Sequence, residues 1–389
     1  VLNDLKAELN LDDEDIIYRM HNSRKELNFN VTEIDNKEIK NFEVIDAMSK
    51  KSSLEETIKS FLEKGMPSSQ KAGIVFTPHV NGEFGCYEVM TQINKIFPTI
   101  KTGFFSGKAP NLWDGVSIED YKKNTQKLFK NNQLDLMCAT KAFGMGINKQ
   151  NVRFTLHYGM PSSMEQLYQE AGRSGRDGKY ADCVVLFSRE PNEIPDYIHH
   201  QNTEISTLQD FSKGFSKGDF GRQMFLMTSN KESEKFEYKE CMKIINMIKN
   251  NINQKQLEIS GIKELYLYRV FQLGIINDWE VIDFFHGRTY NVFYDKYAFK
   301  KIEKTLIKHI KNYVLNDIEL NKYISDIEEL KSKQPKEKHV DVFLKFLLRW
   351  NNNNFVYNRR QQLKTLYENC CNFKNNGSKK FKMSLDEYF

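Results

Sequence analysis

Apolar and polar positions follow two different periods along the first half of the chain. Short apolar runs predict buried strands at 72–80, 134–140, 151–158 and 183–188, with a further strand near 100–105, and the run at 72–80 is rich in β-branched residues. Apolar residues at helical spacing predict helices between them, at 54–64, 85–97 and 117–130. Strands that alternate with helices are typical of a parallel sheet. We therefore predict an α/β lobe at residues 36–190.

One more helix is predicted between the last two strands of this lobe. The segment 162–172 reads SSMEQLYQEAG, and Ser162 or Ser163 is placed to cap its start. Glu165 or Gln166, three residues after each serine, completes a capping box.

The second half of the chain has a different pattern. Residues 191–235 are polar and predict a helical connector. Residues 236–296 predict a helix, a short helix at 254–260, a third helix, and a hairpin that turns at His286-Gly287. Three helices and a two-stranded wing make a winged-helix domain. Residues 297–389 predict a helical C-terminal region, to which the pattern assigns no role.

Composition agrees with a globular protein. The chain has 389 residues, of which 40% are hydrophobic, so it can bury a sizeable core divided between two or three domains. No apolar run approaches the ~20 residues that span a membrane, and the first residues lack the layout of a secretion signal. The expected location is the cytoplasm. The net charge of +5 favours a polyanionic partner without proving one.

The cysteines argue against a metal site. The chain has six cysteines, none in a C-x-x-C pair, and this spacing predicts neither structural zinc nor a disulfide framework. We expect no structural metal and ordinary buried thiols.

Candidate chemistry centres on two arginines. Arg173 and Arg176 lie three apart in the glycine-rich segment GRSGRDG, at 172–178. A guanidinium can bind two phosphate oxygens and stabilise the charge that develops on a γ-phosphoryl group during hydrolysis. A short match of this kind is also typical of a basic surface turn, so the neighbouring sequence has to decide between the two readings.

That neighbouring sequence resembles a known family. Residues 139–149, ATKAFGMGINK, and 169–178, QEAGRSGRDG, resemble motifs V and VI of the superfamily two helicases, most closely the RecQ family of DNA helicases. Residues 72–80 are similar to motif IV, and Gln150 stands where the family usually has proline. The two long matches occur in the family's order.

The resemblance and the basic residues together give a set of predicted site residues. Arg173, Arg176 and Gln169 are expected at the catalytic site, with Asn148 and Gly146 beside the nucleotide. Contacts to nucleic acid are expected from Thr77, His79, Thr140 and Gly144 in the lobe, and from Lys263, Arg269 and Arg288 in the winged helix.

The resemblance implies a DNA helicase that couples ATP hydrolysis with Mg²⁺ to 3′-to-5′ movement, and that binds single-stranded and forked DNA in repair and recombination. The 389 residues contain no Walker A phosphate loop. We therefore interpret residues 1–35 as the tail of a first lobe plus a connector, and expect the 389 residues alone to be inactive as an ATPase. An RNA helicase, or a non-catalytic DNA-binding protein with a degenerate lobe, are the alternatives.

Two departures from the RecQ pattern are visible. Residues 190–235, where many members carry a four-cysteine zinc module, contain no cysteine. The connection at 106–120 is longer than usual and contains Trp113, which either stacks on a base or packs on its own helix.

Overall fold

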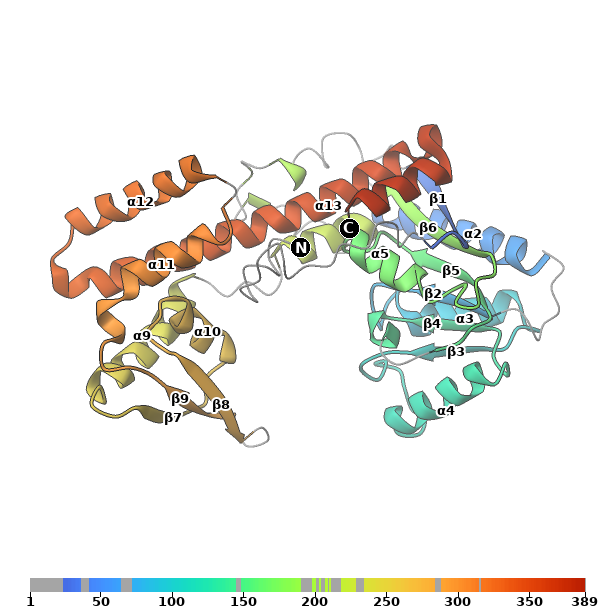
Figure 1. The fold of residues 1–389 in the computed structure, drawn as a ribbon. Helices are drawn as coiled ribbons and strands as arrows, with labels where there is room; N and C mark the ends of the chain where they lie inside the picture. Colours follow the sequence, from blue (N-terminus) through green and yellow to red (C-terminus); the bar gives the residue numbers. More distant parts are fainter. Residues whose placement is uncertain are drawn as a thin grey trace. The chain divides into compact units, whose positions relative to one another are not determined.

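The structure is a computed structural model, and it divides the chain into two compact units, which are described separately (Figure 1). We call the unit of Arg19–Ser229 and Tyr357–Phe389 the lobe, and the unit that contains Asn230–Val356 the helix–sheet unit. The described residues are 24–35, 42–63, 72–144, 148–189, 198–200, 203, 207–208, 210, 218–228, 234–283, 288–314 and 316–388.

The lobe is built on a six-stranded sheet in which every pair of neighbouring strands is parallel. The strand order is β1-β6-β5-β2-β4-β3. The strands are β1 (Leu27–Asp35), β2 (Ala72–Phe76), β3 (Thr102–Phe105), β4 (Leu136–Ala139), β5 (Val152–Tyr158) and β6 (Ala181–Arg189). The predicted parallel α/β lobe is confirmed.

Helices cover this sheet and create its core. They are α2 (Phe42–Glu63), α3 (Cys86–Ile96), α4 (Ile118–Lys130) and α5 (Met164–Ala171). Apolar residues of α2 and α3, among them Ile58 and Val89, pack with Val75, Phe154 and Leu186 of the strands. A second cluster on β2, β4 and β5 contains Phe129 of α4 and Phe143 of a 3₁₀ turn (Lys141–Gly144).

The end of the chain also belongs to the lobe. Helix α13 (His339–Tyr388) contains a non-helical residue, Gly377, with φ of 68°. Residues 357–388 of α13 pack on the strands of the lobe: the ring centroids of Phe29 and Phe381 are 5.8 Å apart, and those of Phe187 and Tyr367 are 5.3 Å apart. The sequence predicted one separate region at 297–389. The structure instead assigns residues 357–388 to the lobe, because they cover strand residues that water would otherwise reach.

The helix–sheet unit combines helices with a small antiparallel sheet of order β7-β9-β8. Its elements are α9 (Glu234–Asn250), β7 (Gln256–Ser260), α10 (Glu264–Gln272), β8 (Asp278–Asp283), β9 (Thr289–Phe293), a 3₁₀ turn (Ala298–Lys300), α11 (Ile302–Lys311), α12 (Asp317–Ser332), a second 3₁₀ turn (Lys336–Lys338) and the first part of α13. The predicted hairpin is confirmed, and its turn, His286-Gly287, lies outside the described residues. The predicted helical C-terminal region is also confirmed.

The short helix predicted at 254–260 is wrong. These residues contain strand β7, in which Ile259 is buried and pairs with Tyr290 of β9. Leu257 and Ile259 alternate with polar residues, which is the period of a half-buried strand. Residues 234–293 therefore contain two helices and a three-stranded sheet rather than three helices and a two-stranded wing.

In the polar connector, α8 (Gly218–Thr228) is helical, as predicted. The expectations for residues 1–23 fall outside the described residues. Within the described parts of the chain, no helix is both long enough and apolar enough to cross a membrane.

Candidate functional site

The two candidate arginines lie in a tight turn that follows helix α5. Ser163 caps the helix, with its hydroxyl oxygen accepting a hydrogen bond from the Gln166 backbone N–H, and Gln166 in turn accepts from the Ser162 N–H. The predicted cap is thereby confirmed, and it fixes where the helix begins. After Gly172 the chain turns through Gly175, whose φ of +63° favours glycine.

The turn also requires glycine at this position for steric reasons. A Cβ on Gly175 would lie 2.8 Å from Cγ of Glu26 and 2.9 Å from the carbonyl oxygen of Lys179. The N–H of Gly175 donates to the Val152 carbonyl at 2.9 Å, which ties the turn to strand β5. Arg153, at 7% exposure, forms an ion pair with Asp177 on the other side of the turn. The backbone that carries both arginines is therefore held against the sheet.

Arg173 and Arg176 are arranged to receive an anion. Burial and the charge of Arg176 lower the pKa of Arg173, although the nearby Glu170 opposes this shift. The Nε of Arg173 is buried and has no hydrogen-bond partner among the described residues. A buried donor without a partner is costly, and two adjacent guanidinium groups repel each other. A phosphate group would relieve both penalties.

The structure brings some of the predicted nucleotide residues together. Arg176 Nη1 donates to Asn148 Oδ1 at 3.2 Å, so motifs V and VI meet here. Gln169 lies in the last turn of α5 with an exposed side chain, four positions before Arg173. Gly146 lies outside the described residues. The roles of all these residues stay predictions.

The predicted nucleic-acid residues of the lobe lie at the carboxyl ends of two neighbouring strands. Thr77 follows β2 and Thr140 follows β4, and the Thr77 N–H donates to the Ala139 carbonyl at 2.8 Å. Thr77 Oγ1 also donates to the carbonyl of His79. Burial and the charge of Arg222 lower the pKa of His79, which favours the uncharged imidazole. Gly144 ends the 3₁₀ turn that follows Thr140.

A buried ion pair lies near the carboxyl ends of β5 and β6. Lys50 Nζ and Asp219 Oδ2 are 2.9 Å apart, and their side chains are 0% and 2% exposed. Asp219 also accepts hydrogen bonds from the backbone N–H groups of Met160, after β5, and Ser188, in β6. This carboxylate therefore fixes α8 to the lobe. Sequence reasoning missed it, because no local pattern marks an aspartate in a polar connector as buried.

The predicted residues of the helix–sheet unit differ in their surroundings. Lys263 and Arg288 are exposed, and the hydrogen bond from the Gly261 N–H to the Arg288 carbonyl brings their segments to one end of the sheet. Arg269 is engaged elsewhere, since its Nε lies 2.6 Å from Glu237 and its Nη1 donates to Gln272. This ion pair competes with any contact between Arg269 and DNA.

Trp113 packs on its own lobe. Its ring lies 5.3 Å from that of Phe104 and 4.7 Å from that of Tyr121, between centroids, and its Nε1 donates to the Val116 carbonyl. Of the two readings of Trp113, the structure therefore supports packing.

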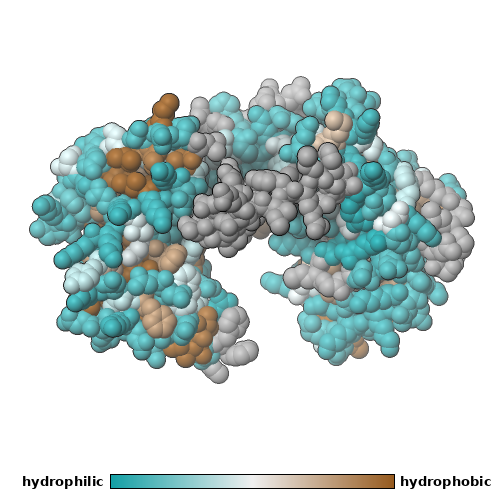
Figure 2. Space-filling view, in the orientation of Figure 1, coloured by the Kyte–Doolittle hydropathy of each residue, from teal (hydrophilic) through white to brown (hydrophobic). Residues whose placement is uncertain are grey.

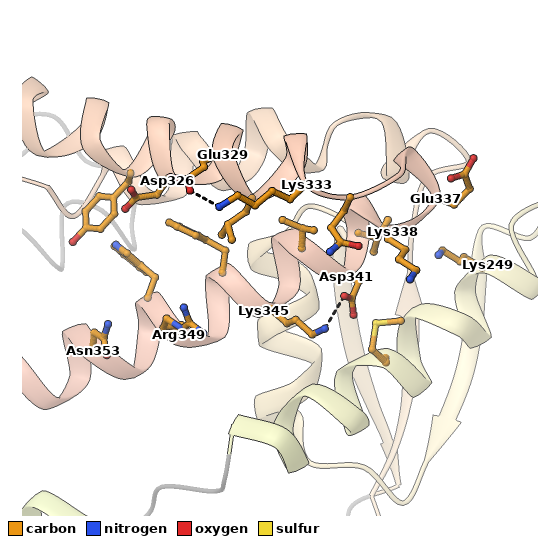
Figure 3. A pocket seen from close by; sticks show the side chains of 18 residues that line it. Lys249, Asp326, Glu329, Lys333, Glu337, Lys338, Asp341, Lys345, Arg349 and Asn353 are labelled. Carbon is orange, nitrogen blue, oxygen red and sulfur yellow. Dashed lines mark hydrogen bonds and ion pairs between the residues drawn. The ribbon is translucent and has the colours of Figure 1, made fainter. Parts of the chain in front are cut away.

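A cavity of about 900 Å³ lies in the helix–sheet unit, between α12 and α13 (Figure 3). Its apolar lining includes Tyr323, Phe346 and Trp350, and charged side chains lie around these rings. Figure 2 shows apolar side chains gathered over these helices. Two of the lysines are already paired, Lys333 with Glu329 and Lys345 with Asp341. The predicted site residues do not line this cavity.

The surroundings of Arg173 and Arg176 can be compared with the groups that a nucleotide would bring. The unpartnered Nε of Arg173 and the neighbouring Arg176 fit a phosphate group. Over the described ranges of the chain, no group of three His, Cys, Asp or Glu side chains could hold a metal ion.

Comparison with known proteins is consistent with this arrangement. Residues 49–178 match the helicase conserved C-terminal domain. The chain is 44% identical over 102 residues to the ATP-dependent DNA helicase RecQ of Bacillus subtilis, which covers 26% of this chain and 17% of that protein. It is 47% identical over 83 residues to the RecQ-like DNA helicase blm-1 of Caenorhabditis elegans, covering 21% of this chain and 8% of that protein. The lobe is thus similar to the C-terminal domain of helicases, and its matching segments are similar to RecQ-family DNA helicases.

One relative is named as an RNA helicase. The putative ATP-dependent RNA helicase R290 of Acanthamoeba polyphaga mimivirus is 34% identical over 155 residues, covering 36% of this chain and 28% of that protein. The chain thus spans less than a third of the length of each of these relatives. The segment that matches the helicase domain contains the turn at 172–178 with Arg173 and Arg176, which we call the arginine turn. It also contains Asn148 and the strand ends at Thr77 and Thr140.

Proposed function

We propose that this chain is the C-terminal part of an ATP-dependent DNA helicase that moves 3′ to 5′. In this proposal, a first lobe holds ATP and Mg²⁺, and the lobe described above supplies Arg173 and Arg176 to the phosphates. The nucleotide supplies the phosphoanhydride bond whose hydrolysis drives movement. The two guanidinium groups neutralise the charge that develops on the transferred phosphoryl group.

The observation that carries this proposal is the environment of the Arg173 side chain. Its Nε is buried without a partner among the described residues, beside a second arginine, on a backbone that is tied to the sheet. A basic surface turn would leave the Arg173 guanidinium in water, as that of Arg176 is, and no such cost would arise. The arrangement therefore supports the catalytic reading over the surface-turn reading.

We propose further that the lobe grips one DNA strand through the strand ends at Thr77 and Thr140, and that His79 adds an uncharged contact. Residues 234–293 are proposed to act as a winged helix that engages duplex DNA at a fork, with Lys263 and Arg288 on phosphates. The proposed compartment is the cytoplasm.

An RNA helicase is the second candidate, because the mimivirus relative is named as a putative ATP-dependent RNA helicase. The two candidates differ in which nucleic acid stimulates ATP hydrolysis. For a full-length protein that contains this chain, we expect single-stranded DNA to raise the rate of phosphate release and RNA of the same sequence to have little effect. The 389 residues alone serve as the control and are expected to release no phosphate, because they contain no Walker A loop.

Stronger stimulation by RNA than by DNA would reverse this assignment. Turnover by the 389 residues alone, after contaminating ATPases have been removed, would contradict the proposal that another lobe holds the nucleotide. A full-length protein without a Walker A loop would support the non-catalytic alternative.

The proposed winged helix leads to a prediction about salt. The logarithm of duplex affinity, plotted against the logarithm of salt concentration, should have a slope of about −0.9 for each neutralised phosphate. Arg288→Ala should make this slope shallower by about 1, and affinity should depend little on base sequence. The measurement is a titration of forked and blunt duplexes at several salt concentrations.

Point substitution is preferable to truncation for this test, because residues 357–388 pack on the lobe. Lys322→Ala, which removes an exposed lysine of α12, is the matched control and should leave the slope unchanged. An unchanged slope for both Arg288→Ala and Lys263→Ala would show that these residues do not contact phosphate.

A further inference from the structure

Arg24 lies near the N-terminal end of the lobe and contacts the arginine turn, at 172–178. Its Nη1 donates to the Gly172 carbonyl at 2.5 Å, and its Nη2 donates to the Ser174 carbonyl at 2.8 Å. Its Nε lies 2.5 Å from Glu26 Oε1. All three nitrogens of one guanidinium are therefore used, and two of them bind the turn.

The two carbonyls that Arg24 binds belong to the residues on either side of Arg173. Hydrogen bonds to the carbonyls of both neighbours restrict the backbone on each side of Arg173, and this backbone determines the position of the Arg173 Cα atom. The Gly175 N–H bond to Val152 and the Arg153–Asp177 ion pair hold the next residues of the turn. The backbone is thus fixed on both sides of Arg173, while the Arg173 Nε has no partner among the described residues.

Arg24 is itself held in place. Glu26 orients its guanidinium, and the Arg24 carbonyl accepts hydrogen bonds from the Leu27 N–H, at 3.2 Å, and from Lys382 of α13. A planar guanidinium with three fixed acceptors is suited to hold two carbonyls at a set spacing. A lysine in the same place has one ammonium group and cannot reproduce this geometry.

We propose that Arg24 is a positioning residue for the arginine turn, and that it acts on phosphoryl transfer by fixing the backbone on both sides of Arg173. This inference rests on the proposed function of Arg173 and Arg176. Electrostatic stabilisation of a transition state depends on charges that are in place before the reaction. A displacement of about 1 Å costs about 100-fold in rate.

A purely structural role gives a different expectation. Gly172 ends helix α5, and a cation at the carboxyl end of a helix stabilises it. In that case Arg24→Ala would lower the stability of the lobe and leave kcat of the folded protein unchanged. The two roles are therefore separable by kinetics.

The test uses a full-length protein that contains this chain and measures DNA-stimulated ATP hydrolysis. Arg24→Ala should lower kcat by about 10- to 100-fold, while the affinity for ADP changes little. Arg24→Lys, which keeps the charge and the bulk, should recover only part of the rate. Glu33→Gln is the matched control. It removes the ion pair between Glu33 of β1 and Arg189 of the neighbouring strand β6, and it should leave kcat unchanged.

A double-mutant cycle with Arg173 decides between the roles. If Arg24 acts through Arg173, Arg24→Ala should lower kcat far less in an Arg173→Ala background than in the native protein. If Arg24→Ala lowers kcat by the same factor in the native protein and in the Arg173→Ala variant, Arg24 does not act through Arg173 and the positioning role is wrong. A native kcat for both Arg24→Ala and Arg24→Lys would do the same.

The proposed function can fail separately from this inference. If Arg173→Ala and Arg176→Ala both keep the native kcat, the arginine turn has no catalytic role and the proposed function is wrong. If those two variants lose activity and Arg24→Ala does not, only the positioning role is wrong.

Discussion

Replacing Arg173 or Arg176 with alanine, in a full-length protein that contains this chain, is expected to lower kcat for ATP hydrolysis by about 1,000-fold or more, as loss of an arginine finger does. The affinity for nucleotide should fall far less, because the guanidinium contact is strongest in the transition state. The measurement is steady-state phosphate release with saturating single-stranded DNA, combined with a direct titration of ADP.

Two further variants test whether charge alone is sufficient. Arg176→Lys should recover little activity, because an ammonium group cannot form the two-pronged contact of a guanidinium. Lys179→Ala removes a neighbouring exposed cation and is the matched control, for which kcat should stay near the native value. Unchanged kcat in both alanine variants would assign these arginines to an ordinary surface turn.

The second large effect is expected in stability. Asp219→Ala leaves the Lys50 ammonium, which is 0% exposed, without its counter-charge, and it also removes the acceptor of two backbone N–H groups. Breaking a buried ion pair by removal of one partner costs about 3–5 kcal/mol. We expect the lobe to open far more often, with faster hydrogen exchange in peptides from β5 and β6.

Local hydrogen exchange is the appropriate measurement, because a chain with two compact units does not have a single free energy of unfolding. Lys59→Ala is the matched control on the same helix, α2. It removes an exposed ion pair with Glu63, and such pairs contribute about 1 kcal/mol or less. Equal exchange rates in Asp219→Ala and Lys59→Ala would show that the buried pair does not support the lobe.

Sequence patterns predicted the elements of the lobe because their signals are local. The apolar runs at 72–80, 134–140 and 151–158 contain strands β2, β4 and β5, and Ser163 with Gln166 marked the start of α5. A buried strand can be predicted from a few consecutive apolar residues, and a helix cap can be predicted from one hydroxyl at the right position. These predictions therefore hold without knowledge of the rest of the chain.

Strand β7 shows where local signals are insufficient. Residues 254–260 are too few to separate a helical from an extended period, and the prediction of a short helix was wrong. Strand β9 decides the conformation, because its backbone offers hydrogen bonds along the whole length of β7. Trp113 is similar, since its sequence allowed two readings and only the rings of Phe104 and Tyr121 determine its environment.

The sequence by itself determined the α/β lobe, the position of its arginine turn and the resemblance to RecQ helicases, because these depend on short periods and contiguous motifs. Only the tertiary structure decided that Asn148 meets Arg176, that Lys50 pairs with Asp219, and that Arg24 binds carbonyls 148 and 150 positions away. Each of these contacts joins segments that the sheet brings together, and a polar side chain has no local signal for a partner so distant along the chain. Burial then makes the contacts strong, because a charge removed from water needs its partner.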